Sequence, residues 1–256
     1  MKTDTSEKGL EALIVGQMTA GGEWVAGNAT GFDRSYAVDQ MQLADFLEAT
    51  QPEVAEALYL RKDSPTRQKF LARLQGEITK RGVVDVLRLG LKHGPHAIEL
   101  FYGTPTPGNA KSAERYAANR FSVTRQLRYS LDETMNALDL ALFVNGLPIA
   151  TFELKNSLTK QTVEDAVEQY KRDRSQKELL FQFGRCLAHF AVDDAEVRFC
   201  TELKGKASWF LPFNKGWNDG AGNPPNPNGI KTDFQKILNR LMQLTVENAA
   251  VSDDDH

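Results

Sequence analysis

The chain has 256 residues, 41% of them hydrophobic, so it is long enough to bury a substantial core in one large domain. A net charge of −3 gives no overall basic signal for nucleic acid, although a site rich in acids needs only a local basic rim to meet DNA. The two cysteines and four histidines lack metal-ligand spacing, and no signal peptide or long apolar run occurs, so we expect a cytoplasmic protein with reduced thiols and neither a zinc site nor a membrane span.

The amino-terminal part of the chain is predicted to pass from mixed structure to helices. From Val38 onward apolar residues recur at helical spacing, and Pro52 suits both the end of one helix and the first turn of the next. We interpret these helices as scaffold. In chain order, the predicted elements are a short strand at 11–15, a glycine-rich loop or hairpin at 18–33, and helices that begin near 38, 52, 67 and 83.

Strands are predicted to follow the helices. We expect one strand over 97–102, a turn-rich loop over 103–109, and a second strand over 121–129 that leads into a hairpin. A basic stretch between the two strands either borders DNA or is the solvated face of a helix. Its cations are Lys111, Arg115 and Arg120.

Residues 138–155 are the most informative stretch and predict a β-hairpin. Asn-Gly at 145–146 is the strongest short hairpin motif. With a two-residue turn, Asp139 and Glu153 would face opposite sides of the sheet, because side chains alternate along a strand. A bulge after the glycine shifts the pairing by one residue and brings the two acids opposite each other. Pro148 has no N–H to donate and favours a bulge or an edge, so we predict the shifted register.

The shifted register predicts one polar face and one apolar face of the hairpin. The predicted pairs are Asp139 with Glu153, Ala141 with Thr151, and Phe143 with Ile149. The predicted apolar face consists of Leu138, Leu140, Leu142, Ala150, Phe152 and Leu154.

The polar face has the residue types that metal-dependent phosphodiester cleavage requires. Two carboxylates opposite each other on neighbouring strands have Cβ atoms about 5 Å apart, which suits a hard Mg²⁺ ion. Such an ion lowers the pKa of a bound water and steadies charge on a phosphate. Lys155 points the same way as Glu153 and could hold or help to deprotonate that water. The sequence therefore predicts a site at Asp139, Glu153 and Lys155, and the alternative is a strand end with ordinary surface charges.

A second Glu-x-Lys motif at 202–204 provides an internal comparison. A turn that begins at Asp193 would place Glu202 opposite Leu187. Glu202 would then lie roughly 20 Å along the strand from Asp193. Carboxylates this far apart cannot share a metal ion, so we predict that this motif is not a metal site.

A helix is predicted after the hairpin, from Thr162 to about Arg174, with a start that resembles a capping box. Gln169 falls at the edge of its apolar stripe, where it could reach a site on the adjoining sheet. Lys171, Arg172 and Arg174 either form a phosphate-binding patch beside the metal or are a charged helix end. Strands or edge elements are expected to complete an α/β domain over 179–183, 188–192 and 196–202.

The carboxyl-terminal part is predicted to leave the domain. A loop over 212–231 is rich in Pro, Asn and Gly, which is typical of a linker or an interaction surface. An amphipathic helix over 232–246 and a disordered tail are expected after it. The aromatic residues before and within the loop are interpreted as docking anchors, and they are Trp209, Phe210, Phe213 and Trp217.

The hairpin sequence NALDLALFVNGLPIATFELKN resembles the nuclease motif of the restriction (R) subunit of type I restriction-modification enzymes, a branch of the PD-(D/E)xK nucleases. Segments at 37–52, 119–127 and 209–224 are similar to that subunit in the same order. The resemblance implies an α/β fold with a PD-(D/E)xK restriction-endonuclease-like core, in which helices flank a central mixed β-sheet. The implied endonuclease domain spans 1–211, with a helical part over about 38–92 and a catalytic sheet over about 97–204.

The resemblance also assigns expected roles to individual residues. In the family, the acids that match Asp139 and Glu153 bind Mg²⁺, and the lysine that matches Lys155 is catalytic. A Gln-x-x-x-Tyr motif follows on the next helix, and Gln169 matches its glutamine. The tyrosine position holds Asp173 in this chain, so the role of the tyrosine is not carried over.

The family further implies a Mg²⁺-dependent endonuclease that hydrolyses double-stranded DNA after translocation by an ATP-driven motor domain. No phosphate-loop motif is present, so we expect an amino-terminal part without that motor, with ATP used only by the motor. The implied partners are DNA, the specificity and modification subunits and the motor domain, in a prokaryotic cytoplasm. Two alternatives stay open: a nuclease of the same superfamily in DNA repair or another defence system, and a catalytically silent docking module of the same fold.

Overall fold

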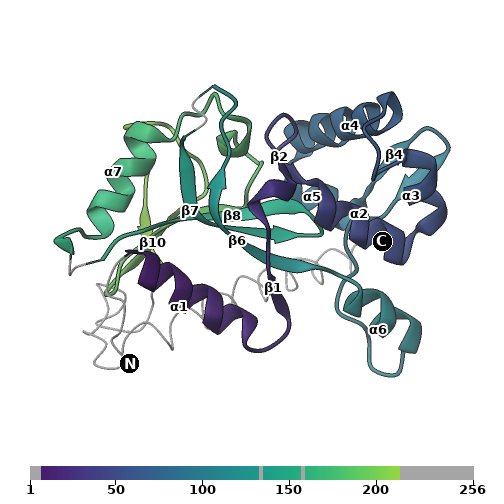
Figure 1. Cartoon of the computed structure of the whole chain (residues 1–256), viewed down its shortest axis with the longest axis horizontal. Helices are drawn as coiled ribbons and strands as arrows, with labels where there is room; N and C mark the ends of the chain where they lie inside the picture. The colour runs from purple at the N-terminus through teal and green to yellow at the C-terminus, as the bar shows by residue number, and fades with distance from the viewer. Residues whose placement is uncertain (1–6, 133–134, 157–158, 214–256) are drawn as a thin grey trace, which may run out of the picture.

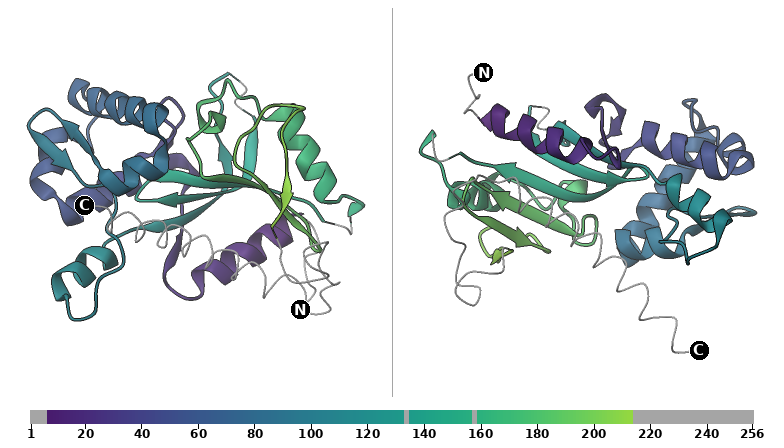
Figure 2. Two further views of the ribbon diagram at one scale, coloured as in Figure 1. Left: turned by 180° about the vertical axis from the view of Figure 1, so that it is seen from behind. Right: turned by 90° about the horizontal axis from the view of Figure 1, so that it is seen from below.

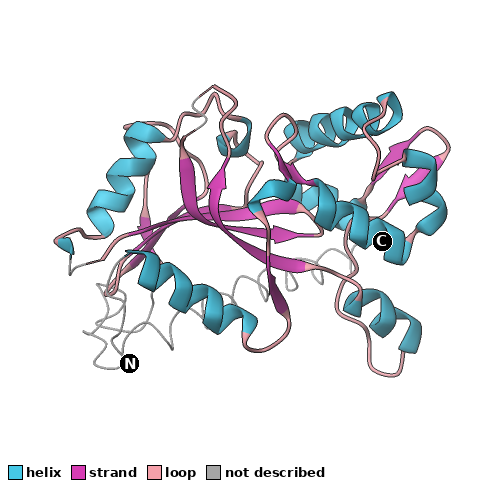
Figure 3. Cartoon of the chain, viewed as in Figure 1, coloured by secondary structure: helices cyan, strands magenta, loops and turns pink. Residues whose placement is uncertain are grey.

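A computed structural model describes residues 7–132, 135–156 and 159–213 (Figure 1). Its centre is a seven-stranded sheet in the order β1-β6-β7-β8-β9-β10-β11. The pairs β1/β6 and β8/β9 are parallel and the others are antiparallel, so the sheet is mixed. Helices flank this sheet (Figure 3), which confirms the predicted α/β class. The predicted helix and tail after residue 213, with Trp217, lie outside the described residues, and the predicted domain boundaries stay predictions.

The strands of the described residues form one large sheet and two small hairpins. The large sheet consists of β1 (Trp24–Ala26), β6 (Phe121–Arg128), β7 (Ala137–Val144), β8 (Leu147–Leu154), β9 (Ala188–Val192), β10 (Val197–Cys200) and β11 (Leu211–Pro212). The small hairpins pair β2 (Phe32–Asp33) with β3 (Val38–Asp39), and β4 (Leu91–His93) with β5 (His96–Ile98).

The helices gather at the two ends and on both faces of the sheet (Figure 1). They are α1 (Glu7–Thr19), α2 (Gln40–Thr50), α3 (Pro52–Leu58), α4 (Pro65–Arg81), α5 (Val83–Leu89), α6 (Ala110–Ala117) and α7 (Val163–Asp173), with short 3-10 helices η1 (Ala29–Gly31) and η3 (Leu179–Phe181). Among the described residues, no helix combines the length and the apolar character that crossing a membrane requires.

The sheet separates two apolar layers. The larger layer packs α1 to α5 against the sheet, and within it the rings of Phe152 and Phe190 stack at 4.8 Å. The smaller layer contains Phe143 and Tyr170 and brings α7 onto the opposite face. Figure 2 shows α1 and α7 on opposite sides of the sheet. The polar face of the hairpin therefore lies on the α7 side, in the thinner layer.

The predicted helices of the amino-terminal half are confirmed, and local chemistry explains where they begin. The Asp39 side chain accepts hydrogen bonds from the first backbone N–H groups of α2. Pro52 opens α3 at a position where a missing N–H costs nothing. The Ser64 hydroxyl caps α4 by accepting from Arg67 N. α5 ends at Gly90, which has a positive φ of 61°.

Two predicted strands are wrong. Residues 11–15 lie within α1, and residues 179–183 contain η3. In α1 the buried residues Leu10, Ile14 and Met18 recur every four positions, so a helical stripe extends beyond the short apolar run that suggested a strand. The spacing of apolar residues over the whole helix therefore predicts this element better than the short run at 11–15 does.

The basic stretch before β6 behaves as a solvated helix. None of the residues of α6, which carries Lys111 and Arg115, is buried. Arg120, just beyond α6, forms an ion pair with Asp45 at 2.9 Å. Contact of these cations with DNA stays a prediction.

The aromatic residues near β11 divide into two kinds. Phe210 packs against Tyr170 with ring centroids 5.6 Å apart, and Phe213 packs edge-on to Phe190 at 5.4 Å. Both rings therefore anchor this strand to the core of the chain itself. Trp209 is 76% exposed, so it alone of these three is available to another molecule.

Candidate functional site

The hairpin of β7 and β8 contains the predicted register slip, but at a different place. Asn145 and Gly146 both have positive φ, and Val144 pairs with Leu147, so the turn has two residues. The slip occurs between the next pairs, because Phe143 pairs with Pro148 and Leu142 with Ala150. The bulge predicted directly after the glycine is therefore wrong in position, and so is the predicted pair of Phe143 with Ile149.

Tertiary contacts explain why the turn itself stays tight. The Asn145 side chain is buried and its Nδ2 donates to the Leu100 carbonyl oxygen at 2.8 Å. A Cβ at Gly146 would collide with the backbone of Asp39 and Leu43 at the start of α2. The extra residue is therefore absorbed within β8, at Ile149.

Beyond the bulge, the register is the predicted one. Ala141 pairs with Thr151 and Leu140 with Phe152. The same register continued by one step would put Asp139 opposite Glu153, and the bond from Leu154 N–H to the Asp139 carboxylate agrees with this. The two acids therefore share one face of the sheet, as predicted. The opposite face is apolar as predicted, since Leu140, Leu142, Ala150, Phe152 and Leu154 all lie in the larger core layer. Leu138 packs instead in the smaller layer.

Asp139 is held in place by two neighbours. Its Oδ2 accepts a hydrogen bond from the backbone N–H of Leu154 at 2.7 Å. Its Oδ1 accepts from Gln126 Nε2 at 3.3 Å. The first bond ties the Asp139 carboxylate to the residue beside Glu153, which keeps the two acids together.

Glu153 is completely buried, and its two carboxylate oxygens differ. Oε1 accepts a hydrogen bond from Arg174 Nε at 2.6 Å, whereas Oε2 is buried with no hydrogen-bond partner. Burial raises the pKa of Glu153 to about 8, because the charged form loses hydration; the nearby charge of Asp139 raises it further, and Arg174 and Lys155 oppose this. A buried carboxylate oxygen without a donor is an unusual feature, since most buried polar atoms have a partner.

The three cations of the predicted phosphate patch at the end of α7 lie in different environments. Arg174 is buried, and besides Glu153 it donates to the Tyr129 hydroxyl at 3.0 Å and to the Ala137 carbonyl oxygen at 2.9 Å. The guanidinium is enclosed by protein acceptors beside Glu153, and its predicted contact with phosphate stays a prediction. Lys171 and Arg172 stay near the surface and pair with Glu168 at 3.5 and 3.1 Å, and their contact with phosphate stays a prediction.

Lys155 follows β8 directly and lies two residues beyond Glu153, so the alternation of side chains places it on the same face. Its backbone N–H donates to the Val192 carbonyl oxygen at 2.8 Å, which extends the pairing with β9. The side chain is mostly buried, and its charge acts on Glu153. The structure thus brings together the three residues predicted from the Glu-x-Lys pattern.

A pocket of about 490 Å³ borders this cluster. Its lining includes Gln169 and Asp173 from α7 and Gln126 from β6, together with Met135, Asn136, Ala137 and Arg174. Gln126 contacts Asp139 and Arg174 contacts Glu153, so two lining residues of the pocket each touch one of the acids. Gln169 lines the same pocket, and its role in a site stays a prediction.

Gln126 has a strained backbone at this position. Its φ is +49° within β6, which is uncommon for a residue other than glycine, asparagine or aspartate. Its Nε2 donates both to Asp139 and to Glu11 Oε2, the latter at 2.8 Å. Strain of this kind tends to persist where function requires a side chain at a particular place.

Glu11 is the acid that sequence reasoning missed. It lies on α1, is 1% exposed, and also pairs with Arg125 Nε. The available signal was an acid within the inward stripe of Leu10, Ile14 and Met18, where a carboxylate needs partners. No group of three or more acidic, histidine or cysteine side chains among the described residues is close enough to hold a metal ion. Gln126 links Glu11 to Asp139 by donating to both carboxylates.

The carboxylate pair fits a hard divalent cation. Mg²⁺ is commonly held by one or two carboxylates and retains several waters, so Asp139 and Glu153 are a sufficient protein contribution. The unpartnered Oε2 of Glu153 is the specific atom that such an ion would satisfy. The carboxylates of Asp139 and Glu153 therefore have the chemistry that a hard divalent cation requires.

Beside the acids, a buried group of hydrogen-bonded side chains packs α7 onto the sheet. The Thr151 hydroxyl is 2.8 Å from the Tyr170 hydroxyl and 2.8 Å from His189 Nδ1. Burial lowers the pKa of His189 to about 3, so this imidazole is neutral. Tyr170, the tyrosine next to Gln169, is thus used to fix the helix.

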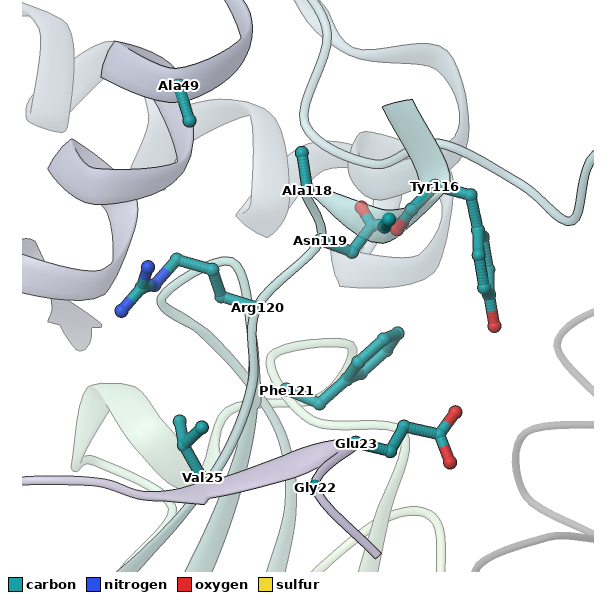
Figure 4. A pocket seen from close by; sticks show the side chains of 10 residues that line it. Gly22, Glu23, Val25, Ala49, Tyr116, Ala118, Asn119, Arg120 and Phe121 are labelled. Carbon is teal, nitrogen blue, oxygen red and sulfur yellow. The ribbon is translucent and has the colours of Figure 1, made fainter. Parts of the chain in front are cut away.

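A second pocket, of about 440 Å³, opens at the other end of β6 (Figure 4). Glu23, Tyr116 and Phe121 are among its lining residues. Asn119, which also lines it, bonds the backbone of Tyr102 through both side-chain atoms. The pocket has no acid pair and no unpartnered buried polar group, so it has no chemistry comparable to that of the acidic cluster.

Comparison with known proteins agrees with the resemblance inferred from the sequence. Residues 100–208 match the family model described as type I restriction enzyme R protein N terminus. A protein of Methanocaldococcus jannaschii, named as a type I restriction enzyme MjaIXP endonuclease subunit, is 27% identical over 126 residues. That alignment covers 49% of this chain and 12% of the relative. The family match includes every predicted site residue from Asp139 to Arg174, and it excludes Glu11.

Proposed function

Because residues 100–208 match the N-terminal region of type I restriction enzyme R proteins, we propose that this chain carries their DNA endonuclease centre on a PD-(D/E)xK-type core. The main support is the place of Asp139 next to the Leu140–Phe152 pair, with its carboxylate bonded to the N–H of Leu154 beside Glu153, together with one carboxylate oxygen of Glu153 that is buried and unpartnered. Lys155 on the same face completes the set. The substrate is the phosphodiester backbone of double-stranded DNA.

In this proposal the residues of the cluster have distinct roles. Asp139 and Glu153 hold Mg²⁺, which when bound supplies charge stabilisation at phosphate and a more acidic water. Lys155 orients the attacking water and shifts its proton equilibrium. Gln169 and Gln126 line the approach and offer neutral donors to the strand being cut. Lys171 and Arg172 contact the backbone outside the pocket.

The larger setting is also part of the proposal. The curated relative is far longer than this chain, and the alignment spans 12% of the relative. We place the endonuclease centre in a complex with specificity and modification subunits, where an ATP-driven motor domain moves DNA before cleavage. ATP is then used by the motor and not by the residues described above.

Manganese binding tests the proposal directly. Titration of the chain with Mn²⁺, followed by electron paramagnetic resonance of the free ion, should reveal one site that Asp139→Asn weakens strongly, because it removes one of two anionic ligands. Glu202→Gln, in the second Glu-x-Lys motif, is the matched control and should bind as the unchanged chain does. Absence of binding at millimolar Mn²⁺, or equal binding by Asp139→Asn, would overturn the proposal.

A further inference from the structure

We infer that Arg174 is a positioning residue that orients Glu153 for the metal, a role distinct from contact with DNA. This inference rests on the proposed function, because it concerns how the same site is held ready. Arg174 follows α7, whereas Glu153 is the second-last residue of β8, so the contact joins the helix to the sheet at the site itself.

The first observation is the geometry of the guanidinium. All three of its nitrogens have acceptors that come from three different strands or strand ends. Nε donates to Glu153, Nη1 to the Tyr129 hydroxyl and Nη2 to the Ala137 carbonyl oxygen, at 2.6 to 3.0 Å. Because the guanidinium is planar and held at three points, it can hold the carboxylate in one orientation.

The second observation is which carboxylate oxygens are occupied. Both oxygens of Asp139 accept hydrogen bonds from protein, one of them at 2.7 Å from Leu154 N. On Glu153, Arg174 occupies Oε1 and leaves Oε2 without a donor. Arg174 therefore determines which atom of Glu153 is left for a cation. The bond from Arg174 Nε therefore holds the Glu153 carboxylate in the orientation that the structure shows.

A purely structural ion pair is the competing interpretation, and the chain offers a control for it. Arg81 on α4 also bridges elements, with Glu77 at 2.8 Å and Asp85 at 2.6 Å, and it lies in the helical part away from the acids. Loss of Arg81 should lower stability without any effect on metal. Loss of Arg174 should lower metal affinity in addition, since partners that orient metal ligands typically contribute about 10- to 100-fold.

The test compares Mn²⁺ dissociation constants at a temperature where circular dichroism shows each variant to be folded. Arg174→Met should weaken binding by about 10-fold or more. Arg174→Lys should recover part of that loss, since an ammonium can reach Oε1 but cannot make the planar contacts. Tyr129→Phe, which removes only the acceptor of Nη1, should weaken binding by a few-fold. Arg81→Met should leave the constant unchanged.

The outcomes separate this inference from the proposed function. If the unchanged chain binds Mn²⁺ and Arg174→Met binds equally well, Arg174 has no positioning role, although the proposed function stands. If Arg174→Met does not fold, the milder Tyr129→Phe decides, and unchanged affinity there rejects the inference. If the unchanged chain itself binds no Mn²⁺, the proposed function fails and the inference fails with it. Equal weakening by Arg81→Met would show a general loss of structure and would also reject it.

Discussion

The tripeptide Glu-Leu-Lys occurs twice in this chain, and the fold places its two copies in opposite settings. At 153–155 the glutamate is 0% exposed and its partner is Arg174, which comes from the end of α7. At 202–204 the glutamate side chain is 40% exposed and pairs with its own neighbour Lys204 at 2.8 Å. The two leucines are alike, because both are buried.

The difference comes from what surrounds each copy. The first copy ends β8, a central strand with β7 and β9 on its two sides. The second follows the last residue of β10, so its side chains are free to turn toward each other and toward solvent. The upstream acid Asp193 accepts hydrogen bonds from the backbone N–H groups of Val163 and Glu196. A Glu-x-Lys pattern therefore indicates a site only where a neighbouring strand supplies a second acid.

The largest expected effect is a difference in DNA cleavage between substitutions in the two Glu-Leu-Lys tripeptides. In the complete restriction complex, Glu153→Gln should lower plasmid cleavage by roughly 10³-fold, because loss of a metal ligand costs several kcal/mol of charge stabilisation. Glu202→Gln should leave cleavage within about two-fold, because its carboxylate is a surface ion pair. Equal rates for Glu153→Gln and the unchanged complex would break the comparison.

The next largest effect is expected on the free energy of unfolding, which should depend much more on the Glu153–Arg174 pair than on the Glu202–Lys204 pair. Arg174→Met should lower the free energy of unfolding by about 3–5 kcal/mol, since it leaves a buried carboxylate without its partner. Lys204→Met removes the exposed equivalent and should cost about 0–1 kcal/mol. Urea denaturation of both variants in metal-free buffer measures the difference. Similar midpoints for the two variants would mean that the Glu153 pair is less enclosed than the structure indicates.

The buried polar group of Thr151, Tyr170 and His189 lies beside the Glu-Leu-Lys at 153–155, and it predicts that stability depends on pH. The pKa of His189 is lowered to about 3 in the folded chain, whereas the unfolded chain binds this proton near 6.5. The stability contributed by neutral His189 is therefore complete above pH 6.5 and is lost as pH falls, by about 1.4 kcal/mol for each pH unit down toward pH 3. Urea midpoints between pH 7 and 5 should fall less steeply in His189→Gln. Parallel slopes would place the imidazole in contact with water.

Local patterns in the sequence determined much of the site. The Asn-Gly turn, the alternation of leucines and the need for one residue of slip together predicted that Asp139 and Glu153 share a face, and the capping box predicted where α7 begins. These signals succeed because a hairpin and a helix start depend on neighbours in the chain. The position of the slip was not predictable, because contacts of Asn145 and Gly146 with distant segments keep the turn tight.

Tertiary structure alone decided the rest. Glu11 reaches the site from 115 residues away through Gln126, and Arg174 turns inward to Glu153 although the charges around it suggested a surface patch. In both cases a charged group is placed by partners far along the chain, and the energy of a buried charge depends on those partners and on lost hydration. Composition and spacing encode neither quantity. The sequence thus determined which residues could meet, and packing decided which of them are enclosed, which are paired and which carboxylate oxygen has no donor.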